Sequence, residues 1–268
     1  MIIVHEGRAH SDDFLAACVC LHKTGLKVIR SKVEQYMLDD PTTWVLDQGL
    51  RFEPEMLNFD HHQLEEEICS LTMVLDHFYG KSYRDHVPEL RFLEILDSFG
   101  SSKAAEFAGM KEDRVDFVSS PIQTGVLKIF SDISGEVIDP MRSIMALIGE
   151  HLCVRVEEGS SLMKSLDSAV VRDVSGISVL DVTSCKPPVG RNHDCLPTKL
   201  WCKINGHKPL VVLTMDSRQE GFYRMVSINR GSVKFVKNPL SDFTHASGFL
   251  TVFKKYGDYQ TILSEYRA

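Results

Sequence analysis

Long apolar runs, a regular cysteine framework and internal repeats are all missing from this 268-residue sequence. No stretch reaches the roughly 18 uninterrupted apolar residues of a membrane-spanning helix. The apolar start, Met1–Val4, is too short for the core of a signal peptide. The seven cysteines follow no regular spacing, which favours a reducing setting over a secreted disulfide scaffold. We therefore expect a cytoplasmic protein with no membrane partner.

Two familiar kinds of site are also missing. The sequence contains no Gly-x-Ser-x-Gly segment of the kind that carries the nucleophile of many serine hydrolases. Cys185, His193, Cys195 and Cys202 offer possible zinc ligands, but their spacing fits none of the usual paired arrangements. Free buried cysteines are common, so we interpret these residues as part of the core.

The charges that are present divide unevenly along the chain. Residues 186–268 contain 13 Lys and Arg against 6 Asp and Glu, whereas residues 1–185 contain 17 against 31. An acidic part can bind cations, and a basic part can attract an anion. The split therefore predicts an anionic partner despite the net charge of −7. Chance asymmetry between two solvated surfaces is the alternative.

The first third of the chain alternates between strand-like and helix-like patterns. Residues 1–5, 26–30 and 43–47 read as short buried strands. Ser11 opens a run with helical spacing and is a plausible cap, and Gly25 marks its end. This alternation predicts a parallel sheet with helices on its faces, whose ligands gather at the carboxyl ends of the strands. His5 and Asp47 each occupy such an end.

Helical spacing dominates the middle of the chain, and the strand signal returns near Gly176. We expect an α/β protein with a parallel-sheet lobe over residues 1–135, a helical connector over 136–175 and a smaller α/β lobe over 176–268. The expected helices cover 65–79, 88–98, 121–131 and 141–170, and the expected later strands cover 177–182, 210–214, 223–228 and 233–236.

Imidazole and carboxylate side chains cluster in the first third of the chain. Together they suit a borderline or hard divalent cation, whereas thiolates indicate a softer one. Two such ions about 3.5–4 Å apart recur in phosphatases and nucleases. Each residue alone is weak evidence, and it is the clustering at successive strand ends that predicts a two-cation site. The candidate residues are His5, His10, Asp12, Asp47, Asp60, His61 and His62.

Four segments carry a recognisable pattern. Residues 3–13 read Ile-Val-His-Glu-Gly-Arg-Ala-His-Ser-Asp-Asp, residues 45–49 read Val-Leu-Asp-Gln-Gly, and residues 59–63 read Phe-Asp-His-His-Gln. Residues 243–249 read Phe-Thr-His-Ala-Ser-Gly-Phe. In this order they resemble the motifs of the MYG branch of the DHH phosphoesterases, including its His-Ala-Ser-Gly-Phe signature. Asp13 stands where that family usually has Glu.

The resemblance implies a bilobed enzyme with a catalytic lobe and a C-terminal substrate lobe. Such enzymes cleave phosphoester or phosphoanhydride bonds with two divalent cations, here expected to be manganese with magnesium as the alternative. By motif position, His5 and His10 would bind one cation, Asp12 and His61 the other, and Asp47 both. A further carboxylate of the family fits Asp97, with Asp76 as a nearby competitor.

Roles for the remaining motif residues follow from the same assignment. His62 is the candidate for contacting the phosphate or protonating the leaving oxygen. Asp60 would hold one of these imidazoles in place, since ligating histidines commonly donate their second N–H to a carboxylate. We expect the basic lobe to bind the phosphate and to face the His61/His62 motif with His245. The candidate substrate-binding residues are His245, Ser247, Gly248, Arg224 and Arg230, and Lys234 is a basic neighbour on a strand-like segment.

The expected function is hydrolysis of phosphoester bonds in a nucleotide or oligonucleotide, in the manner of a 3'–5' exonuclease on RNA or short oligonucleotides. Two alternatives stay open. The chain could hydrolyse a small phosphate ester or a cyclic dinucleotide, or it could bind nucleotides on the same fold without catalysis. The presence of every motif carboxylate favours the enzyme.

Overall fold

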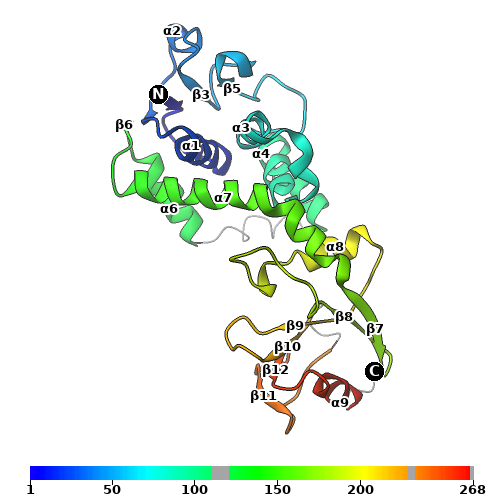
Figure 1. The fold of residues 1–268 in the computed structure, drawn as a ribbon. Coiled ribbons are helices and arrows are strands. Elements are labelled where there is room, and N and C mark those ends of the chain that lie inside the picture. Colours follow the sequence, from blue (N-terminus) through cyan, green and yellow to red (C-terminus); the bar gives the residue numbers. More distant parts are fainter. Residues whose placement is uncertain (110–120, 229–232, 266–268) are drawn as a thin grey trace. The chain divides into compact units, whose positions relative to one another are not determined.

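The structure is a computed structural model that describes residues 1–109, 121–228 and 233–265. The chain divides into two compact units, Met1–Glu157 and Glu158–Ala268. Each contains a six-stranded mixed sheet together with helices, which confirms the expected α/β class (Figure 1). Within the described segments, no helix has the length and apolarity that crossing a bilayer requires.

The sheet of the first unit has a parallel centre and antiparallel edges. Its strands run in the order β4-β5-β3-β1-β2-β6. β5, β3, β1 and β2 are parallel, whereas β4 and β6 pair antiparallel at the two edges. The central strands are short apolar runs buried on both faces, as parallel strands usually are. Their bounds are β1 Ile2–Val4, β2 Val28–Arg30, β3 Trp44–Leu46, β4 Phe52–Glu53, β5 Asn58–Phe59 and β6 Gly135–Glu136.

Helices cover this sheet and share one apolar core with it. α1 packs against β1 and α3, and its buried residues include Phe14 and Val19. α7 approaches α1 so closely that a Cβ on Gly149 would lie 2.1 Å from the Cys18 carbonyl oxygen. The helices are α1 Ser11–Thr24, α2 Gln35–Leu38, α3 Ser70–Tyr79, α4 Pro88–Ala108, α6 Pro121–Ser131 and α7 Met141–Lys164, and the 3-10 turns are η1 Pro54–Met56 and η2 Lys81–Asp85.

The ends of α1 follow from local chemistry. The helix begins at Ser11 with His10 at the N-cap position, so the expectation that Ser11 caps it is wrong. The His10 backbone N–H donates to the Asp13 carboxylate, which satisfies one of the first-turn donors (2.9 Å). Gly25 ends the helix in the left-handed conformation, as expected, and its N–H donates to the Leu21 carbonyl (2.8 Å).

The second unit is a mainly antiparallel sheet with apolar packing on both faces. Its strands run in the order β11-β12-β10-β9-β8-β7, and β8 with β9 is the parallel pair. Val179 and Leu213 pack on one face with α9, and Leu180 and Val212 pack on the other with α8. The elements are η3 Ser165–Ser168, β7 Val170–Val174, β8 Ile177–Asp181, η4 His193–Cys195, α8 Thr198–Ile204, β9 Val211–Met215, β10 Tyr223–Ser227, β11 Ser241–Thr244, β12 Leu250–Phe253 and α9 Asp258–Ser264.

Two sequence expectations differ from these elements. Residues 170–174 form β7, although the helical connector was expected to reach 175. Residues 233–236 form no strand, although Val233 and Phe235 are buried and their neighbours exposed as a strand pattern requires. The Phe235 N–H donates to the Gly248 carbonyl instead of joining a ladder (2.7 Å). The division between the units falls within α7, inside the range expected to connect two lobes.

Candidate metal centre

The motif residues of the first unit meet at the carboxyl ends of its parallel strands. His5 follows β1, Asp47 follows β3, and His61 lies just beyond β5. His10 and Asp12 enter from the start of α1, and Asp97 enters from α4. Residues that are distant in sequence therefore meet because parallel strands end at the same edge of a sheet.

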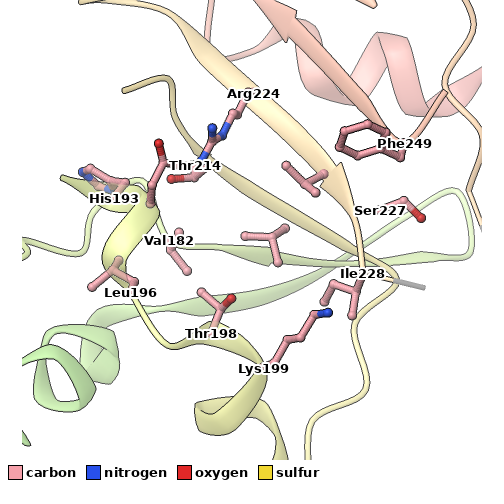
Figure 2. Close-up of a pocket in the computed structure, with 13 residues that line it drawn as sticks. Val182, His193, Leu196, Thr198, Lys199, Thr214, Arg224, Ser227, Ile228 and Phe249 are labelled. Atoms are coloured by element: carbon pink, nitrogen blue, oxygen red, sulfur yellow. Dashed lines mark ion pairs between the residues drawn. The ribbon is translucent and has the colours of Figure 1, made fainter. Parts of the chain in front are cut away.

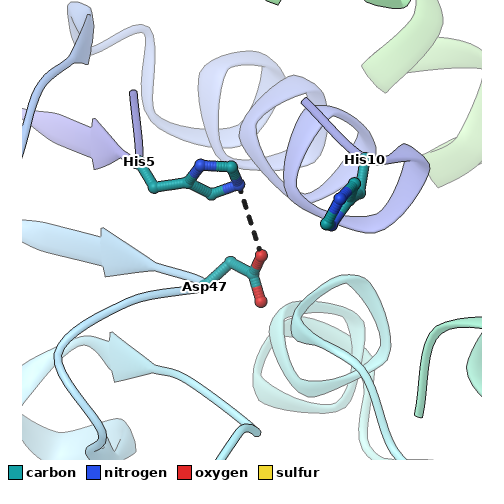
Figure 3. Close-up of side chains that lie close together, drawn as sticks. All are labelled: His5, His10 and Asp47. Atoms are coloured by element: carbon teal, nitrogen blue, oxygen red, sulfur yellow. Dashed lines mark ion pairs between the residues drawn. The ribbon is translucent and has the colours of Figure 1, made fainter. Parts of the chain in front are cut away.

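Three overlapping groups of these side chains have ligand atoms within 4.8 Å of one another. One consists of His5, His10 and Asp47, which Figure 3 shows converging from β1, α1 and β3. The others are Asp47 with His61 and His62, and His10 with Asp12 and Asp97. Asp47 joins the first two groups and His10 joins the first and third. Shared members of this kind place the three groups in one continuous cluster.

Asp47 lies at the centre of the cluster and is almost fully buried, with 4% of its surface exposed. Its carboxylate lies 3.6 Å from the His5 Nε2 and 3.2 Å from the His61 Nε2. The Ser70 hydroxyl donates to the same carboxylate (3.0 Å). The backbone of Asp47 is left-handed, with φ of 57°, a conformation that costs a non-glycine residue energy. That conformation turns the chain sharply at the strand end.

Asp12 and Asp97 add two carboxylates, which lie 3.9 Å and 2.9 Å from the same Nε2 of His61. Burial raises the pKa of Asp12 well above its usual value, and the charges of Asp47 and Asp97 raise it further. Both carboxylate oxygens of Asp12 are buried without a hydrogen-bond donor among the residues that the structure describes. A buried carboxylate normally has such a partner or coordinates a cation. The donor set, imidazole plus carboxylate, also suits a borderline or hard divalent ion.

Hydrogen bonds orient the histidines of this cluster. His5 lies 2.9 Å from the Glu6 carbonyl through Nδ1 and 2.9 Å from the Asp13 carboxylate through Nε2. The bond to Asp13 raises the pKa of His5 to about 9. Burial lowers the pKa of His61, but hydrogen bonds to Asp47 and Asp97 raise it to about 10. These shifts show how strongly the carboxylates favour positive charge at this position.

The two candidates for the additional carboxylate occupy different surroundings. Asp97 contacts His61 at 2.9 Å, and although burial raises the pKa of Asp97, the contact with His61 lowers it. Asp76 instead accepts two hydrogen bonds from the Arg84 guanidinium, at 3.0 and 2.8 Å. Asp97 therefore lies in the cluster, and Asp76 lies in a separate ion pair.

His62 belongs to the cluster through Asp47, which lies 3.7 Å from its Nδ1, and half its side chain is exposed. Its Nδ1 lies 2.7 Å from Asp60 and its backbone N–H donates to the same oxygen (3.0 Å). Asp60 is buried and also accepts the Leu50 N–H (2.6 Å). With its Nδ1–H held by Asp60, a neutral His62 presents Nε2 as its second ring nitrogen. The structure therefore pairs the two residues that the sequence assigned to catalysis.

Sequence reasoning missed two residues that support the loop between His5 and His10. Arg30 is fully buried, donates to the Gly7 carbonyl (2.7 Å) and lies 4.2 Å from the centre of the Phe130 ring. Ser131 accepts the Ala9 N–H (2.8 Å). The sequence could have identified Arg30 as a supporting residue, because it is a charged residue at the end of an apolar strand. No sequence pattern identifies Ser131 in this way.

A cavity of about 380 Å³ opens beside the cluster in the first unit. His10, Asp12 and Asp97 line one part of it, and Arg8 and Gln123 line another. A cation and a polar amide thus lie in the same cavity as the carboxylate side of the cluster. An anionic group could bind there between the cluster and the Arg8 guanidinium.

The C-terminal signature forms the turn between β11 and β12. The Ser247 N–H donates to His245 Nδ1 (3.1 Å), so a neutral His245 carries its proton on Nε2. Gly248 has a φ of 71°, and a Cβ there would lie 2.6 Å from the Phe235 carbonyl oxygen. Gly248 is therefore required by the fold of this turn. Arg224 lies on β10, and Arg230 lies outside the described residues.

Comparison with known families adds one finding. The model named MYG1_exonuc, which describes an uncharacterised protein family (UPF0160), matches residues 1–75. The match covers the segments that carry His5, His10, Asp12, Asp47 and His61, and it ends before Asp97 and the C-terminal signature. No curated protein matches the chain.

Proposed function

We propose that this chain is a metal-dependent phosphoester hydrolase of the DHH type, in its MYG branch. Its substrate would be a nucleotide or oligonucleotide, which it would cleave in the manner of a 3'–5' exonuclease. The observation that carries the proposal is the position of Asp47, buried between His5 and His61 and continuous with the buried carboxylate of Asp12, which lies 3.9 Å from the His61 Nε2. The name of the family model that matches residues 1–75 supports an exonuclease-like activity.

The residues fit two divalent cations. His5, His10 and Asp47 would hold one, and Asp12, His61 and Asp97 would hold the other, with Asp47 close enough to His61 to contribute to both. Manganese suits this mixture of imidazole and carboxylate, and magnesium is the alternative. Divalent cations supply two effects in such hydrolases: they make water a stronger nucleophile and offset charge on phosphate oxygens.

His62 is the group we assign to proton transfer. Asp60 accepts from its Nδ1, which fixes the ring and leaves Nε2 to act on the substrate. The half-exposed position of His62 gives a substrate oxygen access to that nitrogen. A protonated His62 would donate its Nε2 proton to the leaving oxygen, and Asp60 would stabilise the charged ring before that transfer.

Phosphate binding is the role we assign to the signature turn. His245 is exposed, and the Ser247 N–H fixes its tautomer so that Nε2–H is available to a phosphate oxygen. The Gly248 conformation keeps the turn close to Phe235. His245 is thus held in one orientation, which lowers the entropic cost of binding an anion. Its approach to the His61/His62 motif stays a prediction.

The direct test is product analysis with a substrate panel. The purified chain would be incubated with manganese or magnesium and with labelled single-stranded RNA, short oligonucleotides, a cyclic dinucleotide and a small phosphate ester. We expect stepwise release of mononucleotides from one strand end, and loss of that release with a chelator.

Asp47→Asn is the informative variant, because an amide bridges cations poorly. It should lose most bound cation, measured by elemental analysis, together with activity. Asp132→Asn, at an exposed ion pair with Lys128, is the matched control and should behave as the parent chain. Full cation content in Asp47→Asn would remove Asp47 from the bridging role, and binding of every substrate without turnover would contradict the proposed hydrolase.

A further inference from the structure

The second unit contains a cavity of about 500 Å³ on the α8 face of its sheet, and Phe249, whose ring lies 4.5 Å from the ring of the signature histidine His245, is part of its lining (Figure 2). β9 and β10 form its floor together with Val182, which follows β8, and η4 and the first turn of α8 form a wall. Val182, Leu196 and Val212 make much of its lining apolar. This size lies within the range of about 300–1,000 Å³ that small-molecule sites occupy.

Arg224 supplies a hydrogen-bond donor at one end of this cavity. Its side chain comes from β10 and is 15% exposed, and it forms an ion pair with Asp194 of η4. The Ser217 hydroxyl donates to the other oxygen of Asp194. Arg224 Nε is buried with no hydrogen-bond partner among the residues that the structure describes. A buried guanidinium with an unsatisfied N–H is costly unless a ligand completes it.

His193 supplies an acceptor at the same end. Burial lowers the pKa of His193 below its usual value, so the ring is neutral near pH 7. Its Nδ1 is buried and, in the part of the chain that the structure describes, has no hydrogen-bond partner. Arg224 and His193 therefore offer an unsatisfied donor and an unsatisfied acceptor beside one another, and Figure 2 shows them at the same end of the pocket.

Lys199 lies at the opposite end of the cavity (Figure 2). It is exposed on the first turn of α8, next to the hydroxyl of Thr198. The rest of the lining combines apolar side chains with the hydroxyls of Thr214 and Ser227, and it includes Ile228 and the aromatic ring of Phe249. The ligand that matches this order has a polar ring edge, a flat apolar body and an anionic group at its far end.

We propose that this cavity binds a nucleoside monophosphate, free or as the terminal residue of a strand, with its base edge at Arg224 and His193 and its phosphate at Lys199. A nucleobase edge presents both acceptors and donors, which Arg224 Nε and His193 Nδ1 complement. The apolar walls accept the faces of the base, and Phe249 is an aromatic surface of the kind on which bases stack. All residues that line the cavity belong to the second unit, and binding there does not depend on hydrolysis.

Binding to the full-length chain by isothermal titration calorimetry, in the presence of a chelator, tests this assignment. The chelator removes cations from the His/Asp cluster, so phosphate binding there does not contribute. The probes are the four common nucleoside monophosphates, one nucleoside, inorganic phosphate and a dinucleotide with a 5'-phosphate. We expect saturable binding of at least one monophosphate at one site per chain.

Variants separate the two ends of the cavity. Arg224→Ala and Arg224→Lys should each weaken nucleotide binding at least about tenfold, because neither retains the Nε donor. Lys199→Glu should weaken the monophosphate about tenfold and leave the nucleoside unchanged. Arg218→Ala is the matched control, since Arg218 is exposed, pairs with Asp216 and does not line this cavity. Lys199→Glu changes an exposed side chain, so the test survives if Arg224→Ala fails to fold.

Dinucleotide binding that exceeds monophosphate binding and shows the same dependence on Arg224 would support the strand-end source, and equal binding would support the free nucleotide. Inorganic phosphate binding as tightly as every nucleotide, or Arg224 variants with unchanged affinity, would overturn the proposal. So would the absence of saturable binding for all nucleotide probes at millimolar concentration. None of these results depends on whether the chain hydrolyses phosphoesters.

Discussion

At the level of single residues, Asp60 and His62 form a pair joined by two hydrogen bonds. Asp60 holds His62 through its ring and its backbone, while a third bond to Leu50 fixes Asp60 itself. Removing the imidazole should therefore change proton transfer without disturbing the neighbouring ligands. Replacing Asp60 would also affect the fold, because its buried carboxylate accepts hydrogen bonds from the backbone of Leu50 and of His62.

The His62→Ala variant should lower kcat by about 10²–10⁴-fold, the usual contribution of a general acid, while its cation content stays unchanged. Steady-state kinetics must separate kcat from KM, and elemental analysis gives the cation content. The pH profile of kcat should lose one limb in the same variant. Loss of a cation would instead assign His62 to the ligands, since its ring lies near Asp47 and His61.

Stability should depend on pH through His5 and His61. Hydrogen bonds to carboxylates raise the pKa of His5 to about 9, and they outweigh burial to raise the pKa of His61 to about 10. Unfolded histidine has a pKa near 6.5, so their contribution to stability is complete below about 6.5 and is lost as pH rises through 9 and 10.

Urea unfolding with a chelator present should accordingly give a free energy of unfolding that falls between about pH 6.5 and pH 10. His61→Gln should remove part of this slope. Added manganese should act in the opposite direction, because cations compete with protons for the same nitrogens and bind more tightly as pH rises. A free energy that rises across this window in the chelator would contradict the interactions of both histidines.

Among the elements, the contact between α1 and α7 is unusually tight. Gly149 of α7 lies against the Cys18 carbonyl and the His22 side chain of α1, at distances that leave no space for a methyl group. Only a residue without Cβ allows this separation, and main-chain atoms of α1 cannot move without disturbing the helix that carries Asp12.

Gly149→Ala should lower the free energy of unfolding by about 1–3 kcal/mol, the cost of overpacking a core, as measured by urea denaturation. Gly125→Ala in α6 is the matched control, because among the described residues no atom lies within 4 Å of the added Cβ. Alanine is the better helix former, so the control should gain about 0.5–1 kcal/mol. Equal effects of the two substitutions would mean that α7 shifts freely on α1.

Sequence patterns predicted some helices and strands correctly and others incorrectly. The helix expected at 121–131 has those bounds, because its apolar residues follow helical spacing. The strand expected at 233–236 is wrong, because alternate burial of Val233 and Phe235 reports packing and says nothing of backbone pairing. β11 and β12 were missed, since the turn that joins them was interpreted only as a binding motif.

The site was predictable to a similar degree. Adjacent strand ends brought His5, Asp47 and His61 together, as the parallel sheet implied. The contacts made by Ser70, Arg30 and Ser131 could not be predicted, because each depends on a partner distant in sequence and on a particular rotamer. Short motifs identify the ligands, whereas the groups that orient them depend on tertiary packing.

At the scale of the whole molecule, the charge split predicts that cations bind to the first unit and an anionic partner to the second. Acidic residues predominate before residue 186 and basic residues after it. Attraction of a polyanion to the basic part is electrostatic, so it should weaken as salt is added.

Binding of a short single-stranded oligonucleotide to Asp47→Asn should fall about 10- to 20-fold between 50 and 200 mM salt if about three phosphates are contacted. Fluorescence anisotropy measures this dependence. Lys234→Glu, beside the signature turn, should reduce the slope, whereas Lys103→Glu, which removes an exposed cation from α4, should leave it unchanged. A slope equal to that of the parent chain in Lys234→Glu would place the phosphates elsewhere.

The left-handed backbone of Asp47 has a consequence for how the protein can change under selection. Glycine would relieve the backbone strain at this position, and aspartate is tolerated there at some energetic cost. Asp47→Gly would remove this strain together with the carboxylate that accepts from Ser70 and pairs with His61. The strain at position 47 is therefore balanced by contacts of the same side chain, and glycine becomes an acceptable replacement only in a descendant that has lost those contacts and the cation site with them.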